Sequence, residues 1–252
     1  METIAFVAAL KQETRPFLRR VAVSRKSLIE GFPAYRFGLF GRECLLVLSG
    51  VGQMRAIRAL HAVFSVTLPR LVVSFGIAGA LQSDLQVGDV INAHAVRSLA
   101  RGSSGKSQNL LLLSEPAREA AAQALRPIGA RFLPGTALTT PGLQTVDLAG
   151  FSLEHPVLEM ETAAIAQACF TQGVPVLALR GVSDSVDHPL PFDLEEYLDR
   201  EQNLRVGRLL AGLVRDPSLF TRLNLLRRNA ARAAENCAVA MCAALEKHLS
   251  SV

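Results

Sequence analysis

Five polar side chains lie at the borders of apolar segments in the second half of the chain. Two carboxyl groups stand at the start of a helical pattern, and an arginine, a hydroxyl and a third carboxyl group follow a strongly apolar run. These residues are Glu159, Glu161, Arg180, Ser183 and Asp184. Carboxyl groups beside an arginine can transfer a proton and stabilise developing charge, so the set is a candidate for general acid–base catalysis.

Two predicted elements must position these side chains. Apolar residues recur at helical spacing over residues 160–169, which predicts a helix that opens with the two glutamates. After a turn at Gly173, residues 174–179 are apolar without alternation, as in a strand buried on both faces of a parallel sheet. Residues that follow such a strand lie at the carboxyl edge of the sheet, where ligands of open α/β folds usually bind.

A structural interpretation stays open for each of these residues taken alone. Arg180 and Asp184 could form an ion pair, and Glu159 and Glu161 could be charges favoured by the dipole at a helix start. A functional site is favoured because the polar groups converge on one sheet edge from two neighbouring segments.

Two segments carry a resemblance to a known family. LEMETAAIAQAC from residue 158 and LRGVSDSVD from residue 179 resemble the signature of the nucleoside phosphorylase and nucleosidase superfamily, especially 5′-methylthioadenosine/S-adenosylhomocysteine nucleosidases. The resemblance implies that Asp184 protonates or hydrogen-bonds the purine N7, with Ser183 positioning it. It also implies that Glu161 binds the ribose hydroxyls, that Met160 packs on the sugar, and that Glu159 belongs to the same substrate-binding segment.

A further carboxyl group, Glu13, lies near the N-terminus. Residues 3–10 predict a first strand and residues 15–21 predict a helix, so Glu13 is expected at the carboxyl end of the strand. A first-turn helix glutamate is the structural alternative. In the resembled nucleosidases a glutamate follows the first strand at the same distance, which implies that Glu13, with Arg180, holds and activates water.

The glycine-rich segment after residues 71–75 predicts a sharp turn at a strand end. The resemblance places Gly76 and Ile77 in the substrate site. Family members carry a serine or threonine in place of Ile77, and the missing hydroxyl weakens the case for phosphate binding. Residues 131–140 resemble the strand that leads to the base-binding loop, which implies that Thr139 approaches the purine; a surface loop is the alternative.

Length and composition favour one soluble α/β domain over residues 1–252. Half of the 252 residues are hydrophobic, and helical patterns alternate with short apolar runs. With the resemblance, this predicts a three-layer fold in which helices flank a twisted mixed, mainly parallel sheet. No apolar run approaches the ~20 residues of a spanning helix, and the N-terminus lacks the pattern of a signal peptide. We therefore expect a cytoplasmic protein.

The remaining patterns bear on partners. Four cysteines and five histidines show no metal-ligand spacing, so we expect no metal and no cofactor. The net charge is +5, with arginines concentrated in an amphipathic helical tail at about residues 218–249. We interpret the tail as a helix packed on the sheet, with weak contact to an anionic membrane surface as an alternative. No nucleic-acid recognition motif is present.

We therefore expect cleavage of the N-glycosidic bond of a purine nucleoside, by hydrolysis of a 5′-substituted adenosine. The expected partners are the nucleoside and further copies of the chain, because the resembled family forms oligomers. Three alternatives stay open: a phosphate-dependent purine nucleoside phosphorylase, an enzyme that acts on adenosylhopane, and a nucleoside-binding protein without catalysis.

Overall fold

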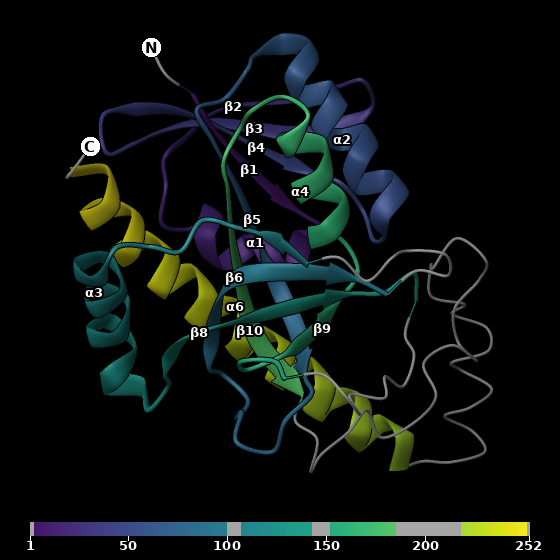
Figure 1. The fold of residues 1–252 in the computed structure, drawn as a ribbon, viewed down its shortest axis with the longest axis vertical. Coiled ribbons are helices and arrows are strands. Elements are labelled where there is room, and N and C mark those ends of the chain that lie inside the picture. Colours follow the sequence, from purple (N-terminus) through teal and green to yellow (C-terminus); the bar gives the residue numbers. More distant parts are fainter. Residues whose placement is uncertain (1–2, 100–106, 143–151, 185–217, 251–252) are drawn as a thin grey trace.

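A single mixed β-sheet runs through the protein, for which a computed structural model describes residues 3–99, 107–142, 152–184 and 218–250 (Figure 1). Its strands are β1 (Ile4–Ala8), β2 (Val23–Ile29), β3 (Phe32–Leu39), β4 (Arg42–Leu48), β5 (Leu71–Ala80), β6 (Val90–Ser98), β7 (Ser107–Asn109), β8 (Phe132–Thr139), β9 (Val157–Glu159) and β10 (Val176–Asp184). The helices are α1 (Lys11–Leu18), α2 (Gln53–Val66), α3 (Glu115–Leu125), the short 3₁₀ helix η1 (Arg126–Ile128), α4 (Thr162–Phe170) and α6 (Ser218–Ser250).

Part of the sheet closes on itself. The strand order is β10-β6-β8-β9-β5-β1-β4-β3-β2, and β10 also pairs with β5, so β5, β9, β8, β6 and β10 form a ring. Parallel pairs join β1 to β4 and β5, β5 to β10, and β8 to β6 and β9, while the other pairs are antiparallel. The mixed sheet predicted from the sequence is confirmed.

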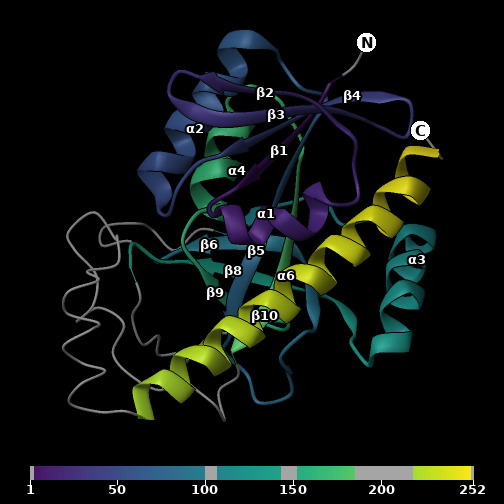
Figure 2. The same ribbon diagram turned by 180° about the vertical axis from the view of Figure 1, so that it is seen from behind.

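Helices cover both faces of the sheet. In β1, Phe6 joins the core beneath α1, α3 and α6, whereas its neighbours Ala5 and Val7 join the core beneath α2 and α4. Successive strand residues point to opposite faces, so an uninterrupted apolar strand supplies both cores. Figure 1 shows α2 and α4 over the front face, and Figure 2 shows α1 and α6 across the back.

Helix α6 lies against the carboxyl half of β10 (Figure 2). A Cβ atom at Gly181 would come within 2.2 Å of the Ala233 carbonyl oxygen, so glycine is required for this close approach. Asn236 is buried in the same helix and donates a side-chain hydrogen bond to the Gly88 carbonyl at 2.7 Å. No helix in the described part of the chain is long and apolar enough to span a membrane.

The strands extend further than the sequence predicted. The polar residues Arg180 and Asp184 lie inside β10, because that strand continues to pair with β5 after the apolar run ends. Strand β5 likewise passes through Gly76 without the predicted turn. Glu159 belongs to β9 and precedes the helix that it was predicted to begin. Helix α1 begins at Lys11, four residues earlier than predicted.

Candidate active site

Glu13 lies in the first turn of α1 and its carboxylate is bound by backbone. Its Oε2 accepts a hydrogen bond from the Leu10 N–H at 2.7 Å, and its Oε1 accepts one from the Ile77 N–H at 3.2 Å. The side chain packs against Gly76, where a Cβ atom would come within 2.8 Å of Oε1. Burial raises the pKa of Glu13, and the backbone N–H groups and the charge of Arg180 partly oppose this. Glu13 is thus both a first-turn helix residue and a buried carboxyl group at the sheet edge.

Arg180 is held in a buried network. Its Nη2 lies 2.8 Å from Ser74 Oγ, 2.7 Å from Thr162 Oγ1 and 3.1 Å from Glu159 Oε2, so its two N–H groups are shared among these three acceptors. Its Nη1 donates to the Leu179 carbonyl at 2.9 Å. The ion-pair partner of Arg180 is therefore Glu159, and the alternative pairing with Asp184 is wrong.

Glu159 organises the start of α4. Its Oε2 accepts hydrogen bonds from the N–H groups of Glu161 at 3.0 Å and Thr162 at 2.8 Å, and from Arg180. Its Oε1 accepts the hydroxyl proton of Thr139. Both carboxylate oxygens are thus bound inside the protein, so the predicted substrate contact of Glu159 is corrected to a supporting role.

Thr139 is buried in β8, which rules out the surface-loop interpretation. Its hydroxyl donates to Glu159 and accepts a hydrogen bond from the Ala163 N–H at 2.9 Å. Because both functions of the hydroxyl are engaged with protein atoms, the predicted approach of this side chain to a purine is corrected: Thr139 joins β8 to α4.

Glu161 lies at the N-cap of α4 and reaches to the turn before α2. Its Oε1 accepts a hydrogen bond from the Gly52 N–H at 2.7 Å. Burial, with a smaller contribution from the charge of Glu159, raises the pKa of Glu161 to about 8. Met160, the residue before it, is half-buried.

Asp184 ends β10 and lies against β5. Its Oδ1 accepts a hydrogen bond from the Ser183 hydroxyl at 2.6 Å, and Ser183 Oγ is also 3.3 Å from the Ala78 carbonyl. A Cβ atom at Gly79 would come within 2.6 Å of Asp184 Oδ2, so the carboxyl group sits directly on the glycine. Burial raises the pKa of Asp184, although the bond from Ser183 opposes this.

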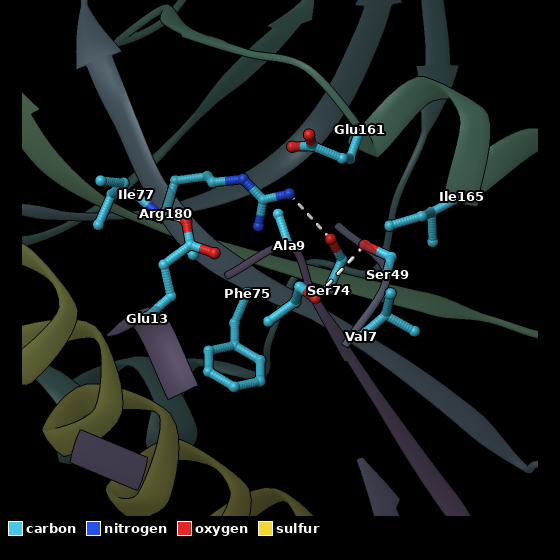
Figure 3. A pocket seen from close by; sticks show the side chains of 12 residues that line it. Val7, Ala9, Glu13, Ser49, Ser74, Phe75, Ile77, Glu161, Ile165 and Arg180 are labelled. Atoms are coloured by element: carbon cyan, nitrogen blue, oxygen red, sulfur yellow. Dashed lines mark hydrogen bonds between the residues drawn. The ribbon is translucent and has the colours of Figure 1, made fainter. Parts of the chain in front are cut away.

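A small cavity joins several of these groups (Figure 3). Its volume is about 10 Å³, close to what one water molecule requires. The polar side chains in its lining are Glu13, Ser49, Ser74, Glu161 and Arg180. In Figure 3 the Arg180 guanidinium lies between the two carboxyl groups. The cavity can therefore hold a small polar molecule between an arginine and two carboxyl groups with raised pKa.

The structure brings together most, but not all, of the predicted site. Gly76 and Ile77 line the cavity with Glu13, Glu161 and Arg180, whereas Asp184 is not among the lining residues. Asp184 pairs with Gly79, which lies three residues beyond Gly76 in β5, about 10 Å at the usual rise of a strand. The segment that follows Asp184 lies outside the described residues.

Sequence reasoning missed three hydroxyl groups of the site. Ser49, Ser74 and Thr162 are buried, and each lines the cavity or binds Arg180. Ser74 occurs inside an otherwise apolar strand, which is a signal that could have singled it out.

Comparisons with known proteins agree on one superfamily. A family model described as the phosphorylase superfamily matches residues 3–215. The 5′-methylthioadenosine/S-adenosylhomocysteine nucleosidase of Marinomonas sp. is 24% identical over 231 residues, which cover 84% of this chain and 100% of that protein. The protein of the same name from Haemophilus ducreyi is 26% identical over 211 residues, covering 77% and 90% of the two chains.

Solved structures share the fold. The 5′-methylthioadenosine/S-adenosylhomocysteine nucleosidase from Neisseria meningitidis, in complex with methylthio-immucillin-A, matches with a TM-score of 0.72 at 21% identity, covering 98% of this chain and 99% of that chain. Native futalosine hydrolase of Helicobacter pylori matches with a TM-score of 0.67 at 16% identity, covering 100% and 98%.

Proposed function

Because the chain belongs to the phosphorylase superfamily, we propose that it is a nucleosidase, which hydrolyses the N-glycosidic bond of a 5′-substituted adenosine to adenine and the free sugar. The substituent is of the methylthio or homocysteinyl kind named in its relatives. The observation that carries the proposal is the pair of carboxyl groups, buried Glu13 and half-buried Asp184, at two positions along β5, each with a raised pKa.

We place the nucleoside at the end of β5, between Glu13 at Gly76 and Asp184 at Gly79. A sugar over Gly76 would face Glu13 and Glu161, and its purine would extend toward Asp184 at Gly79. The raised pKa of Asp184 keeps it protonated closer to neutral pH, as a general acid requires. Asp184 then gives its proton to the purine as the C1′–N9 bond breaks and its electron pair moves to the base.

Water completes the reaction from the other side of the sugar. Breaking the bond leaves positive charge on the sugar, which the carboxylate of Glu13 stabilises, while Glu161, with its pKa of about 8, holds the sugar through hydrogen bonds. Glu13 accepts a proton from the attacking water, and the water oxygen bonds to C1′. Glu159 supports this arrangement through Arg180 and the start of α4.

The cavity favours water over phosphate. Two of the ionisable groups in its lining, Glu13 and Glu161, are carboxyl groups, and a carboxylate repels a dianion. Both Nη atoms of the arginine already donate to protein acceptors. A buried phosphate dianion needs several donors and opposing charge, whereas the arginine of this lining is already paired with Glu159.

Product analysis with and without phosphate tests the proposal. The protein is incubated with methylthioadenosine, adenosylhomocysteine, adenosine or inosine, and free base and sugar are quantified. We expect adenine and free sugar at an equal rate in both buffers. Dependence on phosphate, with a sugar 1-phosphate as product, would show a phosphorylase instead. Binding of the nucleosides without release of base would show a nucleoside-binding protein.

Location and assembly are further parts of the proposal. We place the enzyme in the cytoplasm, as a homo-oligomer, with one domain over residues 1–252. Contact with an anionic membrane surface would use the exposed Arg227, Arg228 and Arg232 of α6. Light scattering would test the oligomer, and co-sedimentation with anionic vesicles at two salt concentrations would test the membrane contact.

A further inference from the structure

Ser74 lies in the middle of β5, on the same face as Gly76. Its side chain is 1% exposed and lines the cavity beside Glu13 and Arg180 (Figure 3). Neighbouring positions of the strand are apolar: Val72, Val73 and Phe75 are all buried. Burying a hydroxyl group costs free energy unless it forms hydrogen bonds. The hydrogen bonds of Ser74 are therefore informative about its role.

The hydrogen bonds of Ser74 leave its hydroxyl proton without an acceptor in the described part of the protein. Its oxygen accepts a bond from Arg180 Nη2 at 2.8 Å. Within the described part of the chain, no protein group accepts its hydroxyl proton. Ser49, the other hydroxyl of the cavity, differs in this respect, because it donates to the Gly50 carbonyl at 2.8 Å. A hydroxyl group carries one donor as well as its acceptor positions, so Ser74 has a donor to offer inside the cavity.

Two other lining residues direct the following donors to protein groups. Ile77 presents an apolar side chain and directs its N–H to Glu13. Arg180 directs Nη1 to the Leu179 carbonyl and Nη2 to Ser74, Thr162 and Glu159. A water molecule here could give a proton to Glu13 and accept a bond from Ser74.

We propose that Ser74 is a catalytic residue that orients the attacking water; the inference rests on the proposed hydrolysis. Ser74 donates its proton to one lone pair of the water, which leaves the second lone pair directed at C1′. The water oxygen bonds to C1′ as the C1′–N9 bond breaks, Glu13 takes the released proton, and Asp184 protonates the purine. Ser74 keeps its own proton throughout.

Ser74→Ala tests this role. We expect kcat to fall about 10- to 100-fold, the effect of losing a hydrogen bond to a group that gains charge, with KM changed less than about threefold. The second readout is the choice of nucleophile. In water with added methanol the wild-type protein should form mainly free sugar, whereas Ser74→Ala should form at least about threefold more methyl glycoside relative to sugar, because the water loses its specific partner and the cavity gains room.

Two matched variants separate the role of the hydroxyl from that of packing. Ser74→Thr keeps a hydroxyl on a side chain suited to a strand and should keep kcat within about threefold. Ser49→Ala removes a hydroxyl whose proton is bound by backbone, so its loss of kcat and its change in product ratio should be much smaller than those of Ser74→Ala.

The outcomes separate the role of Ser74 from the proposed hydrolysis. Wild-type kcat in Ser74→Ala, an unchanged product ratio, or equal losses in Ser74→Ala and Ser74→Thr would overturn the role of Ser74 while leaving hydrolysis intact. If the wild-type protein itself forms no free sugar from any of the nucleosides, the proposed function is wrong and the inference falls with it.

Discussion

Substituting Gly79 by alanine should move the proposed acid without disturbing the fold. The added Cβ would lie 2.6 Å from Asp184 Oδ2, and an ordinary contact begins at 3.4 Å, so the carboxyl group must retreat by about 0.8 Å. The clash is with the end of a side chain, so rotation of Asp184 can relieve it. A displacement of about 1 Å in a catalytic group can cost about 100-fold in rate. We expect kcat to fall about 10- to 100-fold, with the free energy of unfolding changed by less than about 1 kcal/mol.

Adenine release and urea unfolding measure the two quantities. The control is Gly38→Ala in β3, where nothing lies within 4 Å of the added Cβ, so activity and stability should both stay near wild type. A second experiment introduces Gly79→Ala into the Asp184→Asn variant. We expect no further loss of kcat there, because the acid is already absent. Wild-type kcat in Gly79→Ala, or an equal further loss when it is added to Asp184→Asn, would refute the assignment of Asp184 as the group through which Gly79 acts.

Three further predictions concern the carboxyl groups and the helix contact. Asp184→Asn should lower kcat by about two to four orders of magnitude with much less effect on ligand affinity, as stopped-assay kinetics and calorimetry would show; equal losses in both would contradict proton donation. For Glu161, the pKa raised to about 8 means that the folded protein keeps a proton that the unfolded chain loses above its ordinary pKa of 4.5. This group should therefore make the free energy of unfolding fall as pH rises from about 5 to 8, by up to about 1.4 kcal/mol per pH unit. Glu161→Gln should flatten that slope in urea titrations across this range, and an unaltered slope would be evidence against the raised pKa. Gly181→Ala would bring a Cβ within 2.2 Å of the Ala233 carbonyl, so backbone must shift and we expect a loss of about 3 kcal/mol or more, or failure to fold; a melting temperature equal to that of Gly38→Ala would contradict the close packing.

The elements of the sheet centre were predictable because their signals are local. The β3–β4 hairpin, for example, follows from two β-type segments joined by a short turn at Gly41. The ends of strands were less predictable. Strand β10 continues through Arg180 because β5 and β6 pair with it on either side, and it reaches Asp184 through pairing with β5. Pairing with distant segments leaves no local mark in the sequence.

The same limit applies to the roles of the polar residues. Residue type and position predicted that Glu159 and Glu161 belong near a site; Glu161 lines the cavity and Glu159 binds Arg180. The sequence could not show that both oxygens of Glu159 bind the protein while Glu161 faces the cavity, because the partners come from β8, β10 and the turn before α2. Ser74 stands out as a hydroxyl in an apolar strand, but its partner Arg180 comes from β10, so the sequence alone did not indicate its contact.

The packing of α6 on β10 also bears on the order of events during synthesis. The core beneath α6 contains residues of β1 and β5 near the N-terminus together with Cys237, Met241 and Leu245 near the C-terminus. At roughly 5–20 residues per second, a ribosome needs several seconds to add the chain between β10 and the end of α6. During that interval the apolar back of β10 has no covering helix, so a nascent chain, or one shortened before α6, should be a substrate for chaperones and proteases, and β10 is covered only once α6 has been made.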